Sequence, residues 1–336
     1  MNSLHIPPGY TPVLDLYETQ RAIGQLKRSF EDGLAAALNL CRVTCPLFVV
    51  PQSGLNDDLS GNERAVDFAI PATGGEAQIV HSLAKWKRMA LHKYGFPAGQ
   101  GLYTDMNAIR RDEPALDNLH SIYVDQWDWE KIITRDERSI ETLKAAVNAI
   151  HGAILGTHDY IKSVYPKLTL TLPREVTFVT AQELEDIYPD LTPEAREDEY
   201  ARIHGAIFII GIGGKLKSGS RHGGRSPDYD DWTLNGDLIY WNGLLGRAME
   251  LQSMGIRVDP PALDRQLTLS GADGRRALDY HKTLLAGELP LTIGGGIGQS
   301  RLCMLLLEKA HIGEVQVSVW DEATAAGCAA AGIPLL

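Results

Sequence analysis

Cysteine is scarce in this sequence. The chain has 336 residues and four cysteines, whose spacing matches no metal-binding motif that we recognise. A disulfide-built secreted scaffold is therefore excluded. We expect Cys41, Cys45, Cys303 and Cys328 to be reduced and buried in a cytoplasmic protein, the alternative being one exposed thiol. No segment reaches the roughly 18 uninterrupted apolar residues of a membrane span. The N-terminal segment also lacks the positive charge and apolar run of a secretory signal.

Positive charge is also in deficit. Lys and Arg number 32 against 43 Asp and Glu, so the formal net charge is −11. A protein that coats nucleic acid needs a positive surface, which disfavours that role but still allows a local basic pocket. Hydrophobic residues make up 44% of the chain and charged residues 22%, an ordinary globular balance. The length allows two domains or one large domain.

The first clear element is a helix over residues 15–40. Its apolar positions recur at helical spacing, at Leu16, Ile23, Leu26, Phe30, Leu34 and Leu38. Asp15 with Glu18 three residues later resembles a capping box and marks the start. A strand is expected over residues 43–50. Because Pro46 cannot donate to a ladder, this strand should lie at an edge or an interface.

The remaining pattern predicts an α+β protein. Further strands are predicted at 78–83, 121–129, 176–180, 206–212, 237–241, 249–258 and 315–320, and further helices at 83–94, 140–164, 193–204, 261–269 and 275–285. Strands joined by short turns outnumber strand–helix–strand units, so we predict a mostly antiparallel sheet flanked by helices rather than a doubly wound parallel sheet. The polar stretch 217–231 looks like a mobile loop.

A glycine-rich segment, TIGGGIGQSRLCMLLL, occupies residues 292–307. Its glycines at 294, 295, 296 and 298 would let another group approach the backbone closely, and the helix that follows favours an anion at its N-terminus. Arg301, in the first turn of that helix, could reach a phosphate. The alternative is a tight glycine turn between a strand and a packing helix.

A second segment, residues 101–130, combines an arginine with alternating polar residues. Gln126, Asp128 and Glu130 share one face of the predicted strand, because side chains alternate with period two. Arg110 lies near the preceding loop and could bind a phosphate through two hydrogen bonds. The alternative is a charged hairpin with solvated ends.

A third segment suggests a magnesium site. Asp237 and Glu250 fall on two strands that could pair around residues 241–247, and two facing carboxylates would hold Mg²⁺ together with phosphates. Glu250 and Arg257 are an odd number of residues apart, so a regular strand would point them to opposite faces. A β-bulge at Gly255 could bring them to one site. The alternative is a pair of solvated strand-end charges.

Two shorter segments, NDDLSG (56–61) and HSLAKWKR (81–88), carry further charges that taken alone are most simply solvated. Together with the longer motifs they resemble a class II aminoacyl-tRNA synthetase catalytic core. Such a core has a long helix followed by a strand with a proline, a hairpin with an arginine, and a glycine-rich strand that leads into a helix with an arginine.

Within that superfamily the sequence is most similar to the ammonia-dependent asparagine synthetase family, the aspartate–ammonia ligases. The segments that carry the similarity are DDLSG, HSLAKWKR, GLYTDMNAIR, LHSIYVDQWDWE, GIGGKL, PDYDDW, LNGD, SMGIRVD and TIGGGIGQSRL, between residues 57 and 307. Two departures stand out. Asp58 replaces an expected Asn, and the link from Trp232 to Leu234 is shorter than expected, so the neighbouring loop could close differently.

The resemblance implies a two-step reaction. L-Aspartate would attack the α-phosphorus of ATP to give β-aspartyl-AMP and pyrophosphate, and ammonia would then release asparagine and AMP. It implies that Arg110 binds the α-phosphate, that Arg301 binds the terminal phosphates, and that Asp237 and Glu250 hold Mg²⁺. The other implied contacts are Leu119 and Gly296 with the nucleotide, Lys87, Ser82, Gln126, Asp128, Ser253 and Arg257 with aspartate, and Asp57 and Asp230 with ammonia.

The resemblance also implies a homodimer built on the first helix and the proline-bearing strand. We expect one catalytic domain over residues 1–336, with neither an anticodon-binding nor a glutaminase domain, and no nucleic-acid or membrane partner. Two alternatives remain: an aspartyl- or asparaginyl-tRNA synthetase, and a catalytically inactive core that serves as a binding subunit. The inactive core would be expected to lose the phosphate-binding arginines or the metal carboxylates, which are present here.

Overall fold

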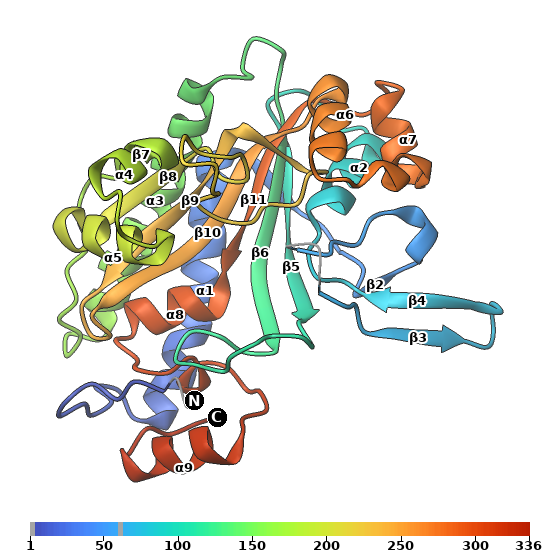
Figure 1. The fold of residues 1–336 in the computed structure, drawn as a ribbon. Coiled ribbons are helices and arrows are strands. Elements are labelled where there is room, and N and C mark those ends of the chain that lie inside the picture. Colours follow the sequence, from blue (N-terminus) through green and yellow to red (C-terminus); the bar gives the residue numbers. More distant parts are fainter. Residues whose placement is uncertain (1–3, 60–62) are drawn as a thin grey trace.

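An eight-stranded sheet forms the centre of the computed structural model, which describes residues 4–59 and 63–336 (Figure 1). In spatial order its strands are β1 (Leu40–Arg42), β5 (Gly101–Ile109), β6 (Tyr123–Ile132), β11 (Thr292–Gly298), β10 (Arg247–Arg257), β9 (Asp230–Asn242), β8 (Ala206–Ile210) and β7 (Thr177–Thr180). The edge strands β1 and β7 pair in parallel with their neighbours, and all the inner pairs are antiparallel. The predicted α+β fold with a mostly antiparallel sheet is therefore confirmed.

Two long helices, α1 (Leu16–Leu38) and α3 (Ile140–Val164), pack together and cover one face of the sheet. Phe30 of α1 contacts the core together with Trp127 and Trp129 of β6, all three fully buried. Because side chains alternate along a strand, Gln126, Asp128 and Glu130, which alternate with these tryptophans, point to the opposite face. The apolar core thus fixes which face of β6 is free to build a site.

The predicted start of the first helix is confirmed. The Glu18 amide donates to Asp15 Oδ1 at 2.7 Å, and the Asp15 amide donates to Glu18 Oε2 at 3.3 Å, which completes a capping box. The helix ends at Leu38, where Asn39 adopts a left-handed conformation with φ of 59°.

Two predicted strands are wrong. Residues 43–50 do not form one strand: Pro46 separates β1 from the short β2 (Phe48–Val49), which joins β3 (Asp67–Ile70) and β4 (Gly75–Ile79) in a second sheet that projects from the body (Figure 1). Residues 315–320 follow a short 3₁₀ helix, η3 (Ile312–Glu314), and pair with no strand of the described chain. Val317 and Val319 are 71% and 69% exposed, so their alternation reflects no buried face.

The other helices agree with the sequence in part. They are α2 (Ala84–Tyr94), α4 (Ala181–Ile187), α5 (Pro193–His204), α6 (Pro260–Leu269), α7 (Asp279–Leu285), α8 (Gln299–Leu306) and α9 (Glu322–Ala330), with 3₁₀ turns η1 (Pro51–Ser53) and η2 (Asp273–Ala277). Helices α4 and α9 were not predicted, and the predicted helix 275–285 divides into η2 and α7. No helix in the described ranges is long and apolar enough to cross a membrane.

The cysteines need one correction. All four are free, and Cys303 and Cys328 are buried as expected, but Cys45 is half-buried and Cys41 is exposed. Cys41 lies on β1, the edge strand of the sheet, where the outer side has no neighbouring strand to cover it.

Candidate active site

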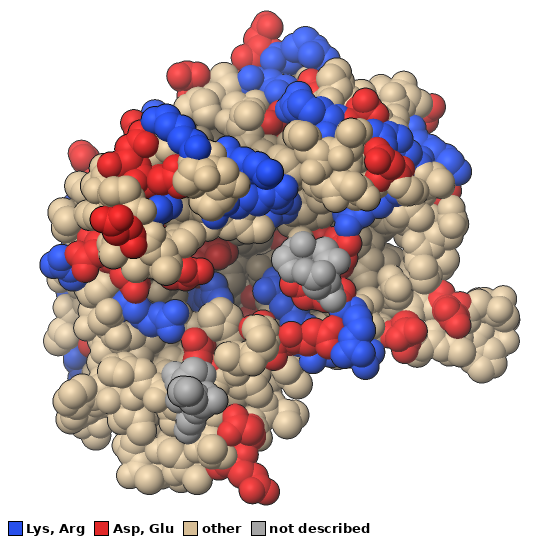
Figure 2. Space-filling model, viewed as in Figure 1, with Lys and Arg blue, Asp and Glu red and all other residues tan. Residues whose placement is uncertain are grey.

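A cavity of about 430 Å³ lies on the sheet face opposite α1 and α3. Figure 2 shows this side of the molecule hollowed near its centre, with acidic and basic side chains around the hollow. The cavity brings together all the residues to which the sequence assigned a role. They are Asp57, Ser82, Lys87, Arg110, Leu119, Gln126, Asp128, Asp230, Asp237, Glu250, Ser253, Arg257, Gly296 and Arg301.

The glycines of β11 provide space in the floor of this cavity. They lie within a strand rather than in a turn, and none of them has a positive φ. A β-carbon on Gly294 would lie 2.0 Å from Glu130 Oε2, and one on Gly296 would lie 2.6 Å from Asp128 Oδ1 and 2.7 Å from Gln126 Oε1. The absent side chains therefore leave room for the polar face of β6, whose three members alternate as predicted.

Two arginines face one end of the cavity. Arg110 follows directly after β5, and its Nε atom is buried without a hydrogen-bond partner among the described residues. Arg301 lies in the first turn of α8, and its guanidinium donates to the Glu250 carbonyl oxygen at 2.9 Å. Because an unpartnered buried donor is costly, the position of Arg110 suits an anion that enters the cavity.

Asp237 of β9 and Glu250 of β10 lie close to one hydroxyl. Ser253 Oγ is 2.7 Å from Asp237 Oδ1 and 3.0 Å from Glu250 Oε1. A register shift between Glu250 and Gln252 lets Glu250 and Ser253 share a face, and a second shift between Gly255 and Arg257 confirms the predicted bulge.

These two carboxyls are electrostatically different. Burial raises the pKa of Asp237, and the nearby Glu250 raises it further against the opposing charge of Arg225. Burial also raises the pKa of Glu250, but the positive charges of Arg301 and Arg225 outweigh it, so the net pKa is lowered. Glu250 is therefore the more firmly ionised of the two.

Lys87 and Asp128 form a buried pair deeper in the cavity. The Lys87 ammonium donates to the Gly295 carbonyl oxygen at 2.8 Å and lies 3.4 Å from Asp128 Oδ1. The Leu83 amide, at the start of α2, donates to Asp128 Oδ2 at 3.1 Å. Burial lowers the pKa of Lys87, although the charge of Asp128 opposes that shift.

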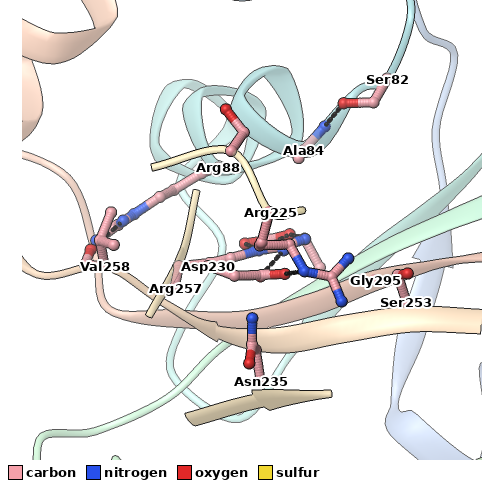
Figure 3. A network of polar contacts seen from close by, with 12 residues as sticks. Ser82, Ala84, Arg88, Arg225, Asp230, Asn235, Ser253, Arg257, Val258 and Gly295 are labelled. Carbon is pink, nitrogen blue, oxygen red and sulfur yellow. Dashed lines mark hydrogen bonds and ion pairs between the residues drawn. The ribbon is translucent and has the colours of Figure 1, made fainter. Parts of the chain in front are cut away.

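Arg257 lies between two carboxylates. Its Nε donates to Glu130 Oε1 at 3.0 Å and its Nη2 to Glu130 Oε2 at 2.8 Å. Its Nη1 pairs with Asp230 (Figure 3). Arg225, whose guanidinium contacts Asp237, also lies 3.7 Å from Asp230. The sequence placed Glu130 on the polar face but gave it no role, and it missed Arg225 entirely.

Arg225 was missed because residues 217–231 read as a mobile polar loop. In the structure the second half of this segment is packed: Ser226, Asp228 and Asp230 are at most 2% exposed, and Asp230 begins β9. The shortened link from Trp232 to Leu234 lies inside the same strand, so no loop is needed there.

Asp57 lines the cavity from a separate segment of the chain. It is 4% exposed, and the Ser82 hydroxyl donates to its Oδ2 at 3.3 Å. Burial raises the pKa of Asp57. Ser60 and Gly61 of the same sequence motif lie outside the described residues. Among the residues that are described, no group of three or more His, Cys, Asp or Glu could hold a metal ion by itself.

The arrangement of the sheet matches known enzymes. An asparaginyl-tRNA synthetase from Pyrococcus horikoshii, solved with asparaginyl-adenylate, superposes with a TM-score of 0.66 over 89% of this chain and 68% of its own, at 14% identity. An aspartyl-tRNA synthetase from Entamoeba histolytica gives 0.62 over 91% of this chain and 58% of its own, at 16% identity. The fold is thus that of the class II aminoacyl-tRNA synthetases.

Sequence comparison narrows this class. A model of the aspartate–ammonia ligase family matches residues 17–332. An aspartate–ammonia ligase of Clostridium perfringens is 59% identical over 100% of both chains, and one of Bacillus cereus is 56% identical over 95% of this chain and 97% of its own. The chain therefore belongs to the aspartate–ammonia ligase family.

Proposed function

We propose that the protein makes L-asparagine from L-aspartate, ammonia and ATP through a β-aspartyl-AMP intermediate. The observation that carries this proposal is a single cavity whose lining includes two chemically distinct groups of side chains, which we term its phosphate end and its aspartate end. Arg110 and Arg301 form an end suited to phosphates, and Lys87, Asp128 and Arg257 form a buried end suited to a small zwitterion. Membership in the ligase family supports the same reaction.

In the first step, the β-carboxylate of aspartate attacks the α-phosphorus of ATP, and pyrophosphate leaves. Arg110 would neutralise the α-phosphate through its buried, unpartnered Nε, and Arg301 would bind the departing phosphates. Catalysis of this kind rests on positioning and on charge stabilisation. Leu119 and Gly296 line the same cavity and would contact the nucleotide.

Asp237 and Glu250 would hold Mg²⁺. Two carboxylates are few for a site built from protein alone, but they fit Mg²⁺, which usually takes one or two carboxylates and completes its shell with water and substrate phosphates. The ion would neutralise charge on the polyphosphate. The chain's contribution is Ser253, whose hydroxyl lies within hydrogen-bond distance of both carboxylates and keeps them on one face.

Aspartate would lie across the polar face of β6. Asp128 suits its ammonium group, and Lys87 and Arg257 suit its carboxylates, with Ser82, Gln126 and Ser253 as neutral partners. Glu130 holds one edge of the Arg257 guanidinium, so this arginine keeps a fixed orientation when the substrate arrives.

Asp57 is the stronger candidate for ammonia. Ammonium must lose a proton before its nitrogen can attack, and the raised pKa of Asp57 makes this carboxylate a better proton acceptor. Asp230, the other candidate, already pairs with Arg257. It would therefore help to attract the cation rather than take its proton.

A tRNA synthetase is the weaker alternative, since the asparaginyl- and aspartyl-tRNA synthetases that share the fold are 14% and 16% identical to the chain. An inactive core is disfavoured because Arg110, Arg301, Asp237 and Glu250 all face one cavity.

The assembly is a second part of the proposal. Four exposed apolar residues, Leu47, Phe48, Val50 and Phe68, form what we term the hairpin patch around the second sheet. The rings of Phe48 and Phe68 lie 5.3 Å apart, edge to face. Exposed apolar clusters mark interaction sites, and this patch follows the first helix, so we infer a homodimer built there. We also infer that the enzyme acts in the cytoplasm.

The test is release of pyrophosphate from ATP and Mg²⁺ with L-aspartate, with and without ammonium, together with detection of asparagine and AMP. We expect aspartate-dependent exchange of pyrophosphate into ATP without ammonium, and asparagine only when ammonium is added. Glutamine in ammonia-free buffer should give almost no product. Equal rates from glutamine, or no aspartate-dependent exchange, would overturn the proposed reaction.

A further inference from the structure

Asp228 is a buried carboxylate to which the proposed reaction gives no role. It is 0% exposed, and three basic groups converge on its Oδ2 atom: Lys85 Nζ at 3.0 Å, Arg275 Nη1 at 2.9 Å and His281 Nε2 at 2.9 Å. The Ser226 hydroxyl donates to Oδ1 at 2.8 Å. These groups hold the pKa of Asp228 well below its usual range, although burial alone would raise it.

Arg275 connects this carboxylate to a second chain segment. Its Nη1 pairs with Asp228, and its Nη2 pairs with Asp58. Asp58 is the neighbour of Asp57, and Asp228 precedes Asp230 by two residues. One guanidinium thus ties together the two segments that carry the proposed ammonia residues, without itself lining the cavity.

Stability alone does not account for such a cluster. Removing several charges from water is costly, and well-packed apolar side chains commonly stabilise a core at least as well. A guanidinium that bridges two carboxylates, however, fixes both distance and direction because its donors form a rigid planar fork. The cluster is therefore better suited to setting the relative position of two loops than to holding the fold.

We propose that Arg275 is a positioning residue for the ammonia half of the reaction, which acts through Asp58 and Asp228 to hold Asp57 at the cavity. This inference rests on the proposed function. Asp58 is also the position where the sequence departs from the expected Asn, and here its negative charge gives Arg275 a second ionic partner.

The test compares Arg275→Gln with Arg276→Gln. Arg276 is a matched control, since it lies in the same 3₁₀ turn and pairs with Asp264 and Asp273, but does not line the cavity. For Arg275→Gln we expect the apparent KM for ammonium to rise about tenfold or more, as loss of a supporting contact commonly does. Aspartate-dependent pyrophosphate exchange should stay within about threefold of wild type, because the phosphate end is untouched. Arg276→Gln should change neither quantity.

Two milder variants keep the test valid if Arg275→Gln folds poorly in a thermal unfolding control. Arg275→Lys keeps the charge but cannot bridge both carboxylates, so we expect an intermediate KM for ammonium. Asp58→Asn should also raise the KM for ammonium. The double variant Asp58→Asn/Arg275→Gln should have a KM close to that of Arg275→Gln alone, because both substitutions break the same ion pair.

An unchanged KM for ammonium in both Arg275→Gln and Asp58→Asn would overturn the proposal. The proposal would also be overturned if Arg275→Gln lost pyrophosphate exchange and asparagine formation to the same extent. Failure of the proposed function itself is distinguishable, because the wild-type protein would then show no aspartate-dependent exchange.

Discussion

Arg301 and Asp57 line one cavity, but the proposed reaction uses them at different steps. Arg301→Ala removes charge that would stabilise the polyphosphate, so adenylation itself should fail, with a loss of about 100- to 1,000-fold. Pyrophosphate exchange and asparagine formation should fall together. Exchange is measured with labelled pyrophosphate and asparagine formation by product analysis, and the thermal midpoint of unfolding serves as a check on folding.

Asp57→Asn should behave differently in the same two assays. An amide attracts ammonium less and cannot take its proton, so asparagine formation should drop and the apparent KM for ammonium should rise. Exchange should largely survive. If this variant loses exchange as completely as Arg301→Ala does, Asp57 binds aspartate or supports the fold instead.

His311 predicts a pH dependence of stability. The Gly313 amide donates to its Nδ1 at 3.0 Å, and burial lowers its pKa from 6.5 to about 4. Between these values the unfolded chain binds a proton that the folded protein does not, so stability is fully present above pH 6.5 and is lost as the pH falls toward 4. The contribution is about 1 to 3 kcal/mol.

This dependence is measured as the thermal midpoint from pH 4 to pH 8, in wild type and His311→Asn. The Asn variant keeps an acceptor for the Gly313 amide but does not titrate, so its midpoint should fall less steeply on acidification. Parallel curves for the two proteins would show that His311 does not contribute.

At the scale of the elements, the glycines of β11 allow a direct test of whether their missing side chains leave space in the cavity. A β-carbon at Gly296 would lie 2.6 Å from Asp128 Oδ1, which is the end of a side chain that can move. Gly296→Ala should therefore fold, but its kcat/KM for aspartate should fall by about 100-fold, because the added carbon displaces Asp128 of the proposed aspartate site and also crowds the proposed nucleotide contact at residue 296. Steady-state kinetics with varied aspartate measures this.

The matched control is Gly152→Ala in the middle of α3. An added β-carbon there meets no atom within 4 Å, and alanine favours a helix over glycine by about 0.5 to 1 kcal/mol. This variant should retain full activity and melt at the same or a higher temperature. Normal kinetics in Gly296→Ala would mean that β11 does not limit the space above Asp128.

The sequence predicted elements well where apolar periodicity was long, as in α1 and α3, and poorly where a strand is polar. β5 was not recognised as a strand because Thr104, Asp105 and Asn107 interrupt its apolar pattern. The segments that carry the candidate site were recognisable as motifs, but the hydrogen-bond partners of their side chains within the cavity were not. Arg257 contacts Glu130, which lies 127 residues earlier in the chain. A local sequence pattern cannot predict a contact between residues so far apart along the chain.

At the scale of the whole molecule, we expect a homodimer of about twice 36.8 kDa by light scattering. Phe48→Asp places a charge in the hairpin patch and should shift the protein toward monomer, because burying an unpaired charge is costly. Ile203→Asp, at a residue 61% exposed on α5, is the control and should leave the mass unchanged. A wild-type monomer with full activity would contradict this assembly.

The contacts within the cavity also differ in how far apart along the chain their two residues lie. Asp237 and Ser253 come from one hairpin and are 16 residues apart, whereas Lys87 reaches Gly295 across 208 residues. Local contacts form early because they close short loops, and distant ones wait for the rest of the chain. The carboxylate pair can therefore assemble while the protein is still being synthesised, and the aspartate end becomes complete only after β11 has been made. Arg301 follows β11 in the chain, so the proposed phosphate end is completed later still, and a newly made chain acquires both ends of the cavity only near its C-terminus.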